Sequence, residues 1–434
     1  MERLFLGCGR TAMANLEMNW AGNIVFGAER YAAPTSVAEL QRLVAGAGRV
    51  RARGSAHSFN RIADTDGLQL AVESLPSSVE VTTDGSRPTA TVRGGVRYAE
   101  LTGHLEQAGF ALHNLGSLPH ISVAGACATG THGSGVTNGG LATAVSGLEL
   151  VTASGDLLRL DRSDPRLAGA VVGLGALGVV VGVTLDLEPT YEVRQFVYEG
   201  LTGDVLRERL DEVLAAAYSV SLFTDWRGRD VRQAWLKQRV DEPASAVGEP
   251  DWMGAVLADG PRNPVPEMSP VHCTEQQGAP GAWHERLPHF KRGFTPSSGE
   301  ELQSEWFVRR QDARAALDAL DTIRERIAGV LQISEIRTIA ADELWLSPAY
   351  QRDCVAFHFT WIKDTASVTP VVRAVEEQLA PFDARPHWGK VFEMPGRTVS
   401  SLYERMPDFA RLSAELDPDG KFRNAFLEEY VPRG

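Results

Sequence analysis

The chain has 434 residues, 43% of them hydrophobic and 23% charged, which is the composition of a globular protein long enough to build two or three lobes. Lys and Arg total 43 against 56 Asp and Glu, a formal net charge of −13 without a basic cluster, so nucleic acid and anionic membrane surfaces are not expected partners. The cysteines lack the spacing of a disulfide framework or a zinc site, which fits a reducing cytoplasm; they are Cys8, Cys127, Cys273 and Cys354.

The N-terminal segment carries only a short apolar patch, which ends at Cys8. An export signal needs an apolar region of roughly 7 to 15 residues, so this patch does not predict secretion. Because Met13 and Met18 are alternative starts, we expect residues 1–18 to be a disordered or overextended N-terminus. No stretch reaches the roughly 18 apolar residues of a membrane span.

Helix and strand patterns follow, and together they indicate a mixed α+β fold. Residues 34–47 predict a first helix, with Pro at its start and apolar residues at helical spacing. RVRARG (49–54) predicts a short strand that ends in the loop GSAHSFN (54–60). The sequence then predicts a strand at TATVRGGV, a helix at VRYAELTGHLEQAG, and two strands within residues 141–160 that turn at Ser154 and Gly155.

The segment GLGALG matches the GxGxxG dinucleotide-binding pattern through Gly173, Gly175 and Gly178. That pattern must follow a strand and open a helix. Here it is followed by VVVGVTLDLEP, which predicts a strand. We therefore reject a nicotinamide-binding unit at this position.

Near residue 190 the chain leaves this glycine-rich region for one richer in Trp and charge, and residues 242–270 predict a long surface excursion. Two later segments, EIRTIAAD (335–342) and CVAFHFTW (354–361), alternate as strands do. Alternation sends Glu335 and Arg337 to one face of the first strand, and His358 and Thr360 to one face of the second. Four polar side chains would then point into one site.

Two glycine-rich segments stand out, ARGSAHSFN (52–60) and SLPHISVAGACATGTHGSG (117–135). Small residues let backbone N–H groups approach a large anionic ligand such as a pyrophosphate. The alternative is that both segments are tight turns in a β-rich fold.

At these segments the chain resembles a known family. GSAHSFN resembles the loop in which a histidine is joined to the 8α-methyl group of FAD, and SLPHISVAGACATGTHGSG resembles the second flavin-binding segment of sugar-alcohol and sugar-lactone oxidases. Further segments resemble alditol oxidases in order: NWAGN (19–23), FTPSSGEELQSEW (294–306), EIRTIAAD, HFTW, PHWGK (386–390) and LDPDGKFRNAF (416–426). The chain thus resembles the alditol oxidase branch of the vanillyl-alcohol-oxidase superfamily from about residue 18 onward.

The resemblance implies a two-lobed α+β fold of the vanillyl-alcohol-oxidase type. An FAD-binding lobe of two α+β subdomains would span residues 1–190, and a substrate-binding cap lobe with an antiparallel sheet would span residues 191–390. Residues 391–434 would return to the FAD-binding lobe.

For the cofactor, the resemblance implies FAD joined covalently to His57 by a single link, which would make the flavin a stronger oxidant and prevent its loss. The family usually has Gly before this histidine, where Ala56 stands here. Taken alone, His57 would more often be a hydrogen-bonded loop residue, and His387 could equally be a core residue. The implied FAD contacts are Ala52, Arg53, Gly54, Ser55, Ala56, Ser58, Ser117, Ser122, Gly125, Ala126, Cys127, Ala128, Val180 and His387, with Cys127 expected to be packed rather than reactive.

For the substrate, the resemblance implies a set of polar side chains that suits a molecule offering only hydroxyls. Its members are Ser117, Glu335, Arg337, Thr360 and Lys390, supported by His358, with Arg337, Lys390 and His358 as the catalytic groups. Without the resemblance, Glu335 and Arg337 would be interpreted as a plain ion pair and Lys390 as a surface charge.

The implied reaction is hydride transfer from the terminal carbinol carbon of an alditol to flavin N5, giving an aldose, followed by reoxidation with O2 to H2O2. Gly116 would leave oxygen an open path, which favours an oxidase over a dehydrogenase. The alternatives are an aldonolactone oxidase or dehydrogenase on the same scaffold and, more remotely, a non-catalytic flavin or carbohydrate binder. We expect a cytoplasmic monomer with a polyol and molecular oxygen as its partners and with no metal site.

Overall fold

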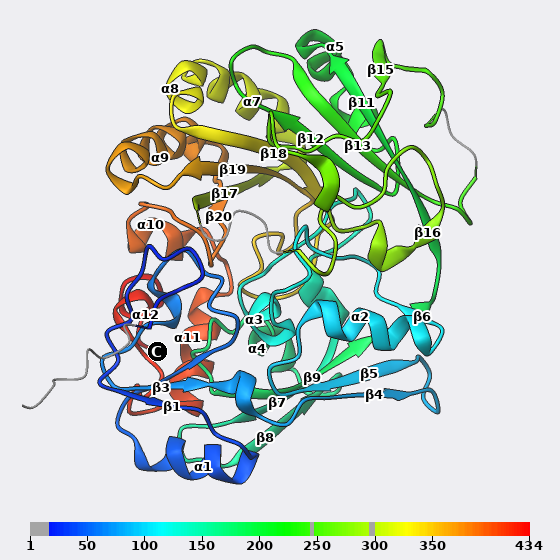
Figure 1. Ribbon diagram of the computed structural model, residues 1–434. Coiled ribbons are helices and arrows are strands. Elements are labelled where there is room, and N and C mark those ends of the chain that lie inside the picture. Colours follow the sequence, from blue (N-terminus) through cyan, green and yellow to red (C-terminus); the bar gives the residue numbers. More distant parts are fainter. Residues whose placement is uncertain (1–16, 244–246, 295–299) are drawn as a thin grey trace, which may run out of the picture.

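The computed structural model describes residues 17–243, 247–294 and 300–434. Most of the predicted N-terminal extension, residues 1–16, and part of the segment 294–306, residues 295–299, lie outside the described residues. The chain forms two lobes, with the N-terminal strands and the C-terminal helices together in one lobe and a large sheet in the other (Figure 1). None of the described helices is long and apolar enough to cross a membrane.

Among the described residues, the first lobe contains two larger sheets and a two-stranded antiparallel pair of β6 (Phe110–Ala111) and β10 (Glu188–Pro189). A three-stranded parallel sheet has the order β1-β3-β2, and a five-stranded antiparallel sheet has the order β4-β5-β9-β7-β8. The bounds are β1 (Arg30–Ala32), β2 (Val50–Arg53), β3 (Leu68–Ala71), β4 (Ser78–Thr82), β5 (Thr89–Arg93), β7 (Val145–Val151), β8 (Leu157–Asp161) and β9 (Val179–Asp186). This confirms the strands predicted at 49–54, at TATVRGGV, within 141–160 and after GLGALG.

Two helices of this lobe lie within the segments 34–47 and 96–109 in which the sequence predicts them. Helix α1 (Val37–Gly46) is capped by Ser36, whose hydroxyl accepts from the Glu39 backbone N–H, while the Glu39 carboxylate accepts from the Thr35 N–H. Helix α2 (Tyr98–Gln107) buries Tyr98, Leu101 and Leu105 along one face. Short helices α3 (Val123–Ala128) and α4 (Leu167–Ala170) lie with α2 on the side of the five-stranded sheet that faces the second lobe (Figure 1).

GLGALG forms a tight loop rather than a helix start. Gly175 and Gly178 have φ values of +68° and +151°, and a Cβ on Gly178 would lie 2.6 Å from the Val151 carbonyl oxygen. Strand β9 follows directly. The glycines therefore serve the turn and its close packing against β7.

The second lobe is built on a ten-stranded sheet with antiparallel pairing. Its order is β14-β15-β11-β13-β12-β18-β19-β17-β20, with β16 paired to β11. Helices α7 (Ala313–Asp321), α8 (Arg324–Ala328) and α9 (Thr365–Leu379) cover the face turned away from the first lobe (Figure 1). The strand bounds are β11 (Glu192–Leu201), β12 (Ser219–Thr224), β13 (Val231–Arg239), β14 (Asp251–Trp252), β15 (Ala255–Leu257), β16 (Gly281–Ala282), β17 (Glu301–Arg309), β18 (Leu331–Ile339), β19 (Cys354–Ile362) and β20 (Arg385–Pro386).

The register of the central strands aligns the polar side chains that the sequence predicts on one face. Glu335 on β18 lies opposite His358 on β19, and His358 in turn lies opposite Glu305 on β17. The predicted strands at 335–342 and 354–361 are therefore neighbours, and their polar residues share one surface of the sheet.

The segment 242–270 is more than a surface excursion, which corrects the sequence-based expectation. It contains β14 and β15, and Trp252 and Ala255 are buried. Asn263 is also buried, and its side-chain amide donates to the Ser269 carbonyl. The segment forms a folded edge of the ten-stranded sheet despite its many Pro and Gly residues, because apolar side chains between them are buried.

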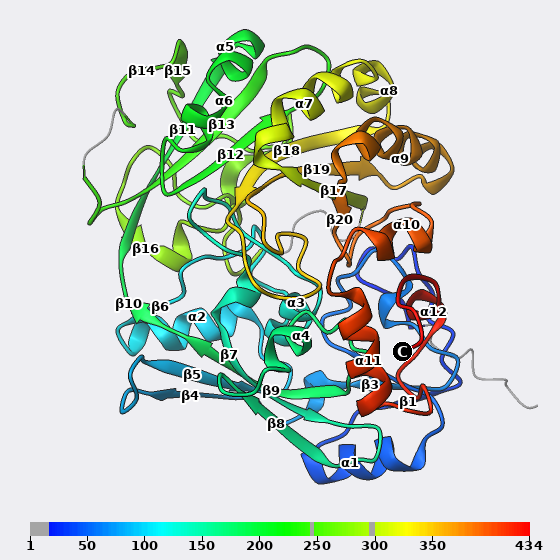
Figure 2. The same cartoon turned by 180° about the vertical axis from the view of Figure 1, so that it is seen from behind.

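The C-terminal segment packs on the first lobe. Helices α11 (Met406–Leu416) and α12 (Ala425–Tyr430) lie near β1 and β3 in both views, and α10 (Gly396–Ser401) contacts α12 on the side toward the second lobe (Figures 1 and 2). The Arg51 guanidinium donates to the Phe422 carbonyl at 2.9 Å, and the Val50 N–H donates to the Lys421 carbonyl at 2.9 Å. The domain limits at residues 190 and 390 remain predictions.

Candidate active site

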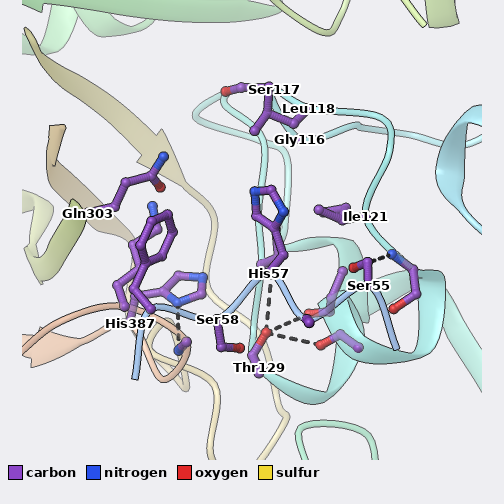
Figure 3. A pocket seen from close by; sticks show the side chains of 18 of the residues that line it. Ser55, His57, Ser58, Gly116, Ser117, Leu118, Ile121, Thr129, Gln303 and His387 are labelled. Carbon is purple, nitrogen blue, oxygen red and sulfur yellow. Dashed lines mark hydrogen bonds between the residues drawn. The ribbon is translucent and has the colours of Figure 1, made fainter. Parts of the chain in front are cut away.

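A large cavity of about 2070 Å³, part of it open to solvent, lies between the two lobes. Its walls come from the end of β2 and the loop after it, from residues 116–132, from β9, and from the inner face of β17, β18 and β19. Figure 3 shows His57 projecting into this cavity, with Gly116 and Ser117 near its tip and with Gln303 and His387 on one side.

The His57 loop is held by segments from both ends of the chain. The Asn19 side chain donates to the Ser58 carbonyl at 3.0 Å, and the Trp20 N–H donates to the Ala56 carbonyl at 2.8 Å. At the other end of the chain, the carbonyls of Trp388 and Lys390 accept hydrogen bonds from the Asn60 side-chain amide, both at 2.8 Å. The NWAGN and PHWGK segments thus fix the loop that carries His57.

Ala56 has a φ of 52°, the left-handed conformation. This explains why a glycine suits the position before the histidine, since a Cβ in this conformation costs roughly 1–2 kcal/mol. The loop keeps its conformation here through the backbone hydrogen bond that Ala56 accepts from Trp20.

The His57 imidazole is buried against aromatic rings. Its centroid lies 4.2 Å from the Trp20 ring and 5.0 Å from the His120 ring. Burial lowers the pKa of His57 to about 3 and that of His120 to about 4, so both rings are neutral at physiological pH. Within the described part of the chain, neither ring nitrogen of either histidine has a hydrogen-bond partner. His57 therefore carries a free nitrogen lone pair that could form a bond to carbon.

Glycines let the two glycine-rich segments pack closely together at Ser122 where they border the cavity. A Cβ on Gly54 would collide with the Ser122 hydroxyl, and a Cβ on Gly125 would lie 2.8 Å from the same oxygen. On α3, Ala124, Gly125 and Ala128 line the cavity with small side chains. Together with the unpaired His57, this surface fits a flavin that is approached closely by backbone.

On the wall formed by β17 and β18, the Glu305 carboxylate contacts two cationic side chains and a histidine. Its side chain has no exposed surface, and its carboxylate lies 2.7 Å from Lys390 Nζ, 3.0 Å from Arg337 Nη2 and 3.1 Å from His132 Nε2. Burial alone would raise the pKa of Glu305, but the charges of Lys390, His132 and Arg337 hold it well below its usual range. Arg337 also donates to the Ser117 hydroxyl at 3.3 Å, which reaches across to the first lobe.

Glu335 and His358 complete the polar surface. Glu335 Oε1 lies 2.8 Å from His289 Nε2, and although burial opposes its charge, Arg337 and His289 keep its pKa below the usual range. His358 Nε2 lies 3.2 Å from Oε1 of the Gln303 side-chain amide. Burial, followed by the charge of Lys390, lowers the pKa of His358 well below its usual value, so its imidazole is neutral.

Almost all the residues predicted from the sequence line this one cavity. They are Ala52, Arg53, Gly54, Ser55, Ala56, His57, Ser58, Ser117, Ser122, Gly125, Ala126, Ala128, Val180, Glu335, Arg337, His358, Thr360, His387 and Lys390. Cys127 does not line it, because it lies on the face of α3 turned toward the core, with its sulfur 3.7 Å from the Tyr98 hydroxyl. Burial raises the pKa of the Cys127 thiol to about 11.

Sequence reasoning missed several residues of the site. Gln303 and Glu305 alternate in β17 as the polar residues do in β18 and β19, so the same signal was present in the sequence. Leu174 and Gly175 of the rejected GLGALG motif also line the cavity, through loop backbone rather than a helix. His132 lies within the glycine-rich segment 117–135 but was not singled out, and His289 lies in a loop for which the sequence carried no signal.

Comparisons with known proteins show which family the chain resembles. A family model described as FAD binding domain matches residues 28–161, and one described as D-arabinono-1,4-lactone oxidase matches residues 299–430. An alditol oxidase of Streptomyces sp. is 51% identical over 96% of this chain and all of its own length. An L-gulono-1,4-lactone dehydrogenase of Mycobacterium tuberculosis is 31% identical over 97% of this chain and 99% of its own.

Solved structures give the same fold at much lower identity. The crystal structure of cholesterol oxidase from B. sterolicum superposes with a TM-score of 0.78 over 96% of both chains, at 15% identity. This confirms the two-lobed α+β fold. The chain therefore belongs to the alditol and aldonolactone oxidoreductases, FAD-dependent enzymes of the vanillyl-alcohol-oxidase superfamily.

Proposed function

We propose that this enzyme is an alditol oxidase, which removes a hydride from the terminal carbinol carbon of a polyol and gives the aldose. The observation that carries the proposal is the pair of cationic groups, Arg337 and Lys390, that Glu305 holds on the cavity wall opposite the His57 loop. FAD, when bound, supplies the hydride acceptor, and oxygen restores its oxidised form with release of hydrogen peroxide.

We propose that His57 holds FAD through a single covalent link. Its neutral imidazole, free of hydrogen bonds, supports this role. The remaining contacts would come from the end of β2, from residues 117–128, from Val180 and from His387, which together border the first-lobe side of the cavity.

The polar wall would bind and orient the polyol. Arg337 and Lys390 donate toward the hydroxyl oxygen on the carbon that is oxidised and stabilise negative charge as it develops on that oxygen. Glu335, Ser117 and Thr360 hold neighbouring hydroxyls, which fixes the carbon that faces the cofactor. Glu305 does not need to touch the polyol, because its part is to keep both cations in place.

We assign the hydroxyl proton to His358. Its imidazole is neutral, and a proton on Nε2 that is donated to Gln303 would leave the lone pair of Nδ1 to accept another. Lys390 is better suited to remain a donor, because its ammonium group contacts the Glu305 carboxylate at 2.7 Å.

Gly116 supports an oxidase rather than a dehydrogenase. The nearest contact that a Cβ at this position would make is with the His132 carbonyl oxygen at 3.7 Å, so the glycine leaves open space at the cavity wall. Oxygen could approach through that space.

The test is to add xylitol and sorbitol to the purified yellow protein under air, to follow hydrogen peroxide, and to precipitate the same sample with acid. Peroxide release with a yellow pellet is expected. If the pellet is yellow but the native enzyme forms peroxide with L-gulono-1,4-lactone and not with alditols, the function moves to the lactone branch. The match to a lactone oxidase model makes this branch the second candidate. Flavin that no alditol or lactone bleaches would refute catalysis on either substrate class.

We further propose that the enzyme acts as a cytoplasmic monomer, with lobes divided near residues 190 and 390. The three cysteines in the described part of the chain are free and buried, which is compatible with a reducing compartment. Sedimentation of the purified holoenzyme would test the monomer.

A further inference from the structure

A polar chain leads from the interior of the second lobe to the substrate wall, and its inner end is Lys237. This residue lies in the middle of β13, between β11 and β12, and is only 1% exposed. Its ammonium group donates to the Leu287 carbonyl and lies 3.1 Å from His289 Nδ1. Within residues 17–243, 247–294 and 300–434, no carboxylate forms an ion pair with it.

This arrangement costs stability. A buried ammonium without a carboxylate partner is disfavoured relative to an apolar side chain of similar size. Burial accordingly lowers the pKa of Lys237 to about 7. Packing alone would be served better by methionine or leucine, so the lysine calls for an explanation beyond the core.

The chemistry of the donors fixes the direction of the hydrogen bonds. The ammonium form of Lys237 can only donate, so His289 Nδ1 accepts from it; in the amine form the ionised Glu335 carboxylate, which can only accept, still requires the proton on Nε2 and leaves Nδ1 as the acceptor. His289 must then carry its proton on Nε2 and donate it to Glu335 Oε1 at 2.8 Å. Burial lowers the pKa of His289 to about 4, which keeps the ring neutral and this tautomer well defined.

The His289 ring is also held in place by its surroundings. It packs edge to face between Phe223 and Trp235, with centroids 5.4 Å and 5.3 Å away. Its backbone N–H donates to the Ser117 carbonyl at 3.2 Å, and its carbonyl accepts from the Thr274 N–H at 2.9 Å. The ring therefore has little freedom except in the position of its proton.

The consequence appears at Glu335. Oε1 is bound by His289 Nε2 at 2.8 Å and lies 3.5 Å from Arg337 Nε, and within the described residues Oε2 of this cavity-lining side chain has no hydrogen-bond donor. Without the donor at Lys237, His289 Nδ1 is a buried acceptor without its partner, and the ring loses the contact that aims its Nε2 proton at Glu335. Glu335 would turn away from the position in which it accepts a substrate hydroxyl.

We propose that Lys237 and His289 are positioning residues that hold Glu335 as a hydroxyl acceptor and so set the affinity of the site for polyols. The proposal rests on the proposed function, since it assigns the origin of substrate affinity within the same cavity.

The test compares Lys237→Met with Lys237→Gln. Methionine removes the donor at similar volume, whereas the glutamine amide can still donate to His289 Nδ1. We expect the KM for xylitol to rise about three- to tenfold in Lys237→Met, which is the usual effect of one net hydrogen bond, and to stay near the wild-type value in Lys237→Gln. The rate of flavin reduction at saturating xylitol should change less than about twofold, because Arg337 and Lys390 are untouched.

Measuring the Tm separates a positioning role of Lys237 from a general loss of stability in the variant. The Tm of Lys237→Met should equal or exceed that of the wild type, because a buried cation has been removed. Lys363→Met removes a lysine charge from the surface, where Lys363 lies 3.8 Å from Glu300, and should leave both KM and Tm unchanged. In His289→Leu, the KM should rise as in Lys237→Met, and adding Lys237→Met should raise it no further.

A KM for xylitol in Lys237→Met equal to the wild-type value would overturn the positioning role. The role would also be overturned if Lys237→Met and Lys237→Gln raised the KM equally and both had a lower Tm than the wild type. Should His289→Leu not fold, the two Lys237 variants still decide the matter. Failure of the proposed function is distinct from these outcomes, because it would be seen in the wild type as absence of alditol oxidation.

Discussion

Replacing Glu305 with glutamine should separate the two cations of the substrate wall. In the wild type, Oε1 accepts from Arg337 at 3.0 Å and Oε2 accepts from Lys390 at 2.7 Å. Glutamine has one oxygen and one amide nitrogen, so in either orientation an N–H group faces a cationic donor. Loss of one partner from a buried ion pair typically costs about 3–5 kcal/mol, and we expect a decrease of that size in the free energy of unfolding.

The displaced cation should also weaken catalysis. Loss of one donor at the site of developing negative charge slows a reaction by about 10²–10³-fold. We therefore expect anaerobic flavin reduction by saturating xylitol, followed by stopped-flow absorbance, to be roughly 100-fold slower in Glu305→Gln. Glu305→Asp keeps the charge and should lose less. Flavin reduction at the wild-type rate in Glu305→Gln, together with the lower stability, would refute the anchoring role of Glu305 in catalysis.

Three further predictions concern other parts of the molecule. In His57→Ala, acid precipitation should leave the flavin in the supernatant, and the flavin midpoint potential should fall; a yellow pellet would exclude His57 as the point of attachment. Gly116→Val should slow reoxidation of the flavin by air and spare its anaerobic reduction, and unchanged reoxidation would contradict the oxygen path. Burial raises the pKa of Asp342 from 3.8 to about 6, so the folded state retains a proton that the unfolded chain loses, and stability should fall by roughly 3 kcal/mol as pH rises from about 4 to 6. Asp342→Asn should remove this slope and be more stable than the wild type at pH 7.5, whereas parallel stability curves for the two proteins would speak against it.

The sequence predicted most of the elements because their patterns are local. Alternation in β18 placed Glu335 and Arg337 on one face, and the pattern of residues 96–109 predicted helix α2. Register between distant strands is not local. Nothing in the sequence places Glu305 opposite His358, or Lys237 beside His289, because such contacts depend on antiparallel pairing and on loop packing.

Ala56 shows a different limit. Its neighbours predicted the loop and its histidine, but the left-handed backbone at Ala56 could be seen only in the structure. A glycine at that position would have signalled the conformation through its own preference. Alanine gives no such signal, because it disfavours the left-handed conformation and adopts it here only through tertiary hydrogen bonds.

The contacts that join the two ends of the chain also bear on how the enzyme is made. Arg51 binds the carbonyl of Phe422, 371 positions later, and Asn60 binds that of Lys390, 330 positions later. A ribosome delivers the N-terminal strands and the His57 loop long before it delivers these partners, so the first lobe emerges with unfilled hydrogen bonds and open apolar edges. The loop can settle only when synthesis is nearly finished. Cofactor capture therefore belongs to the completed polypeptide, and the emerging N-terminal half is the stage at which chaperones would be needed most.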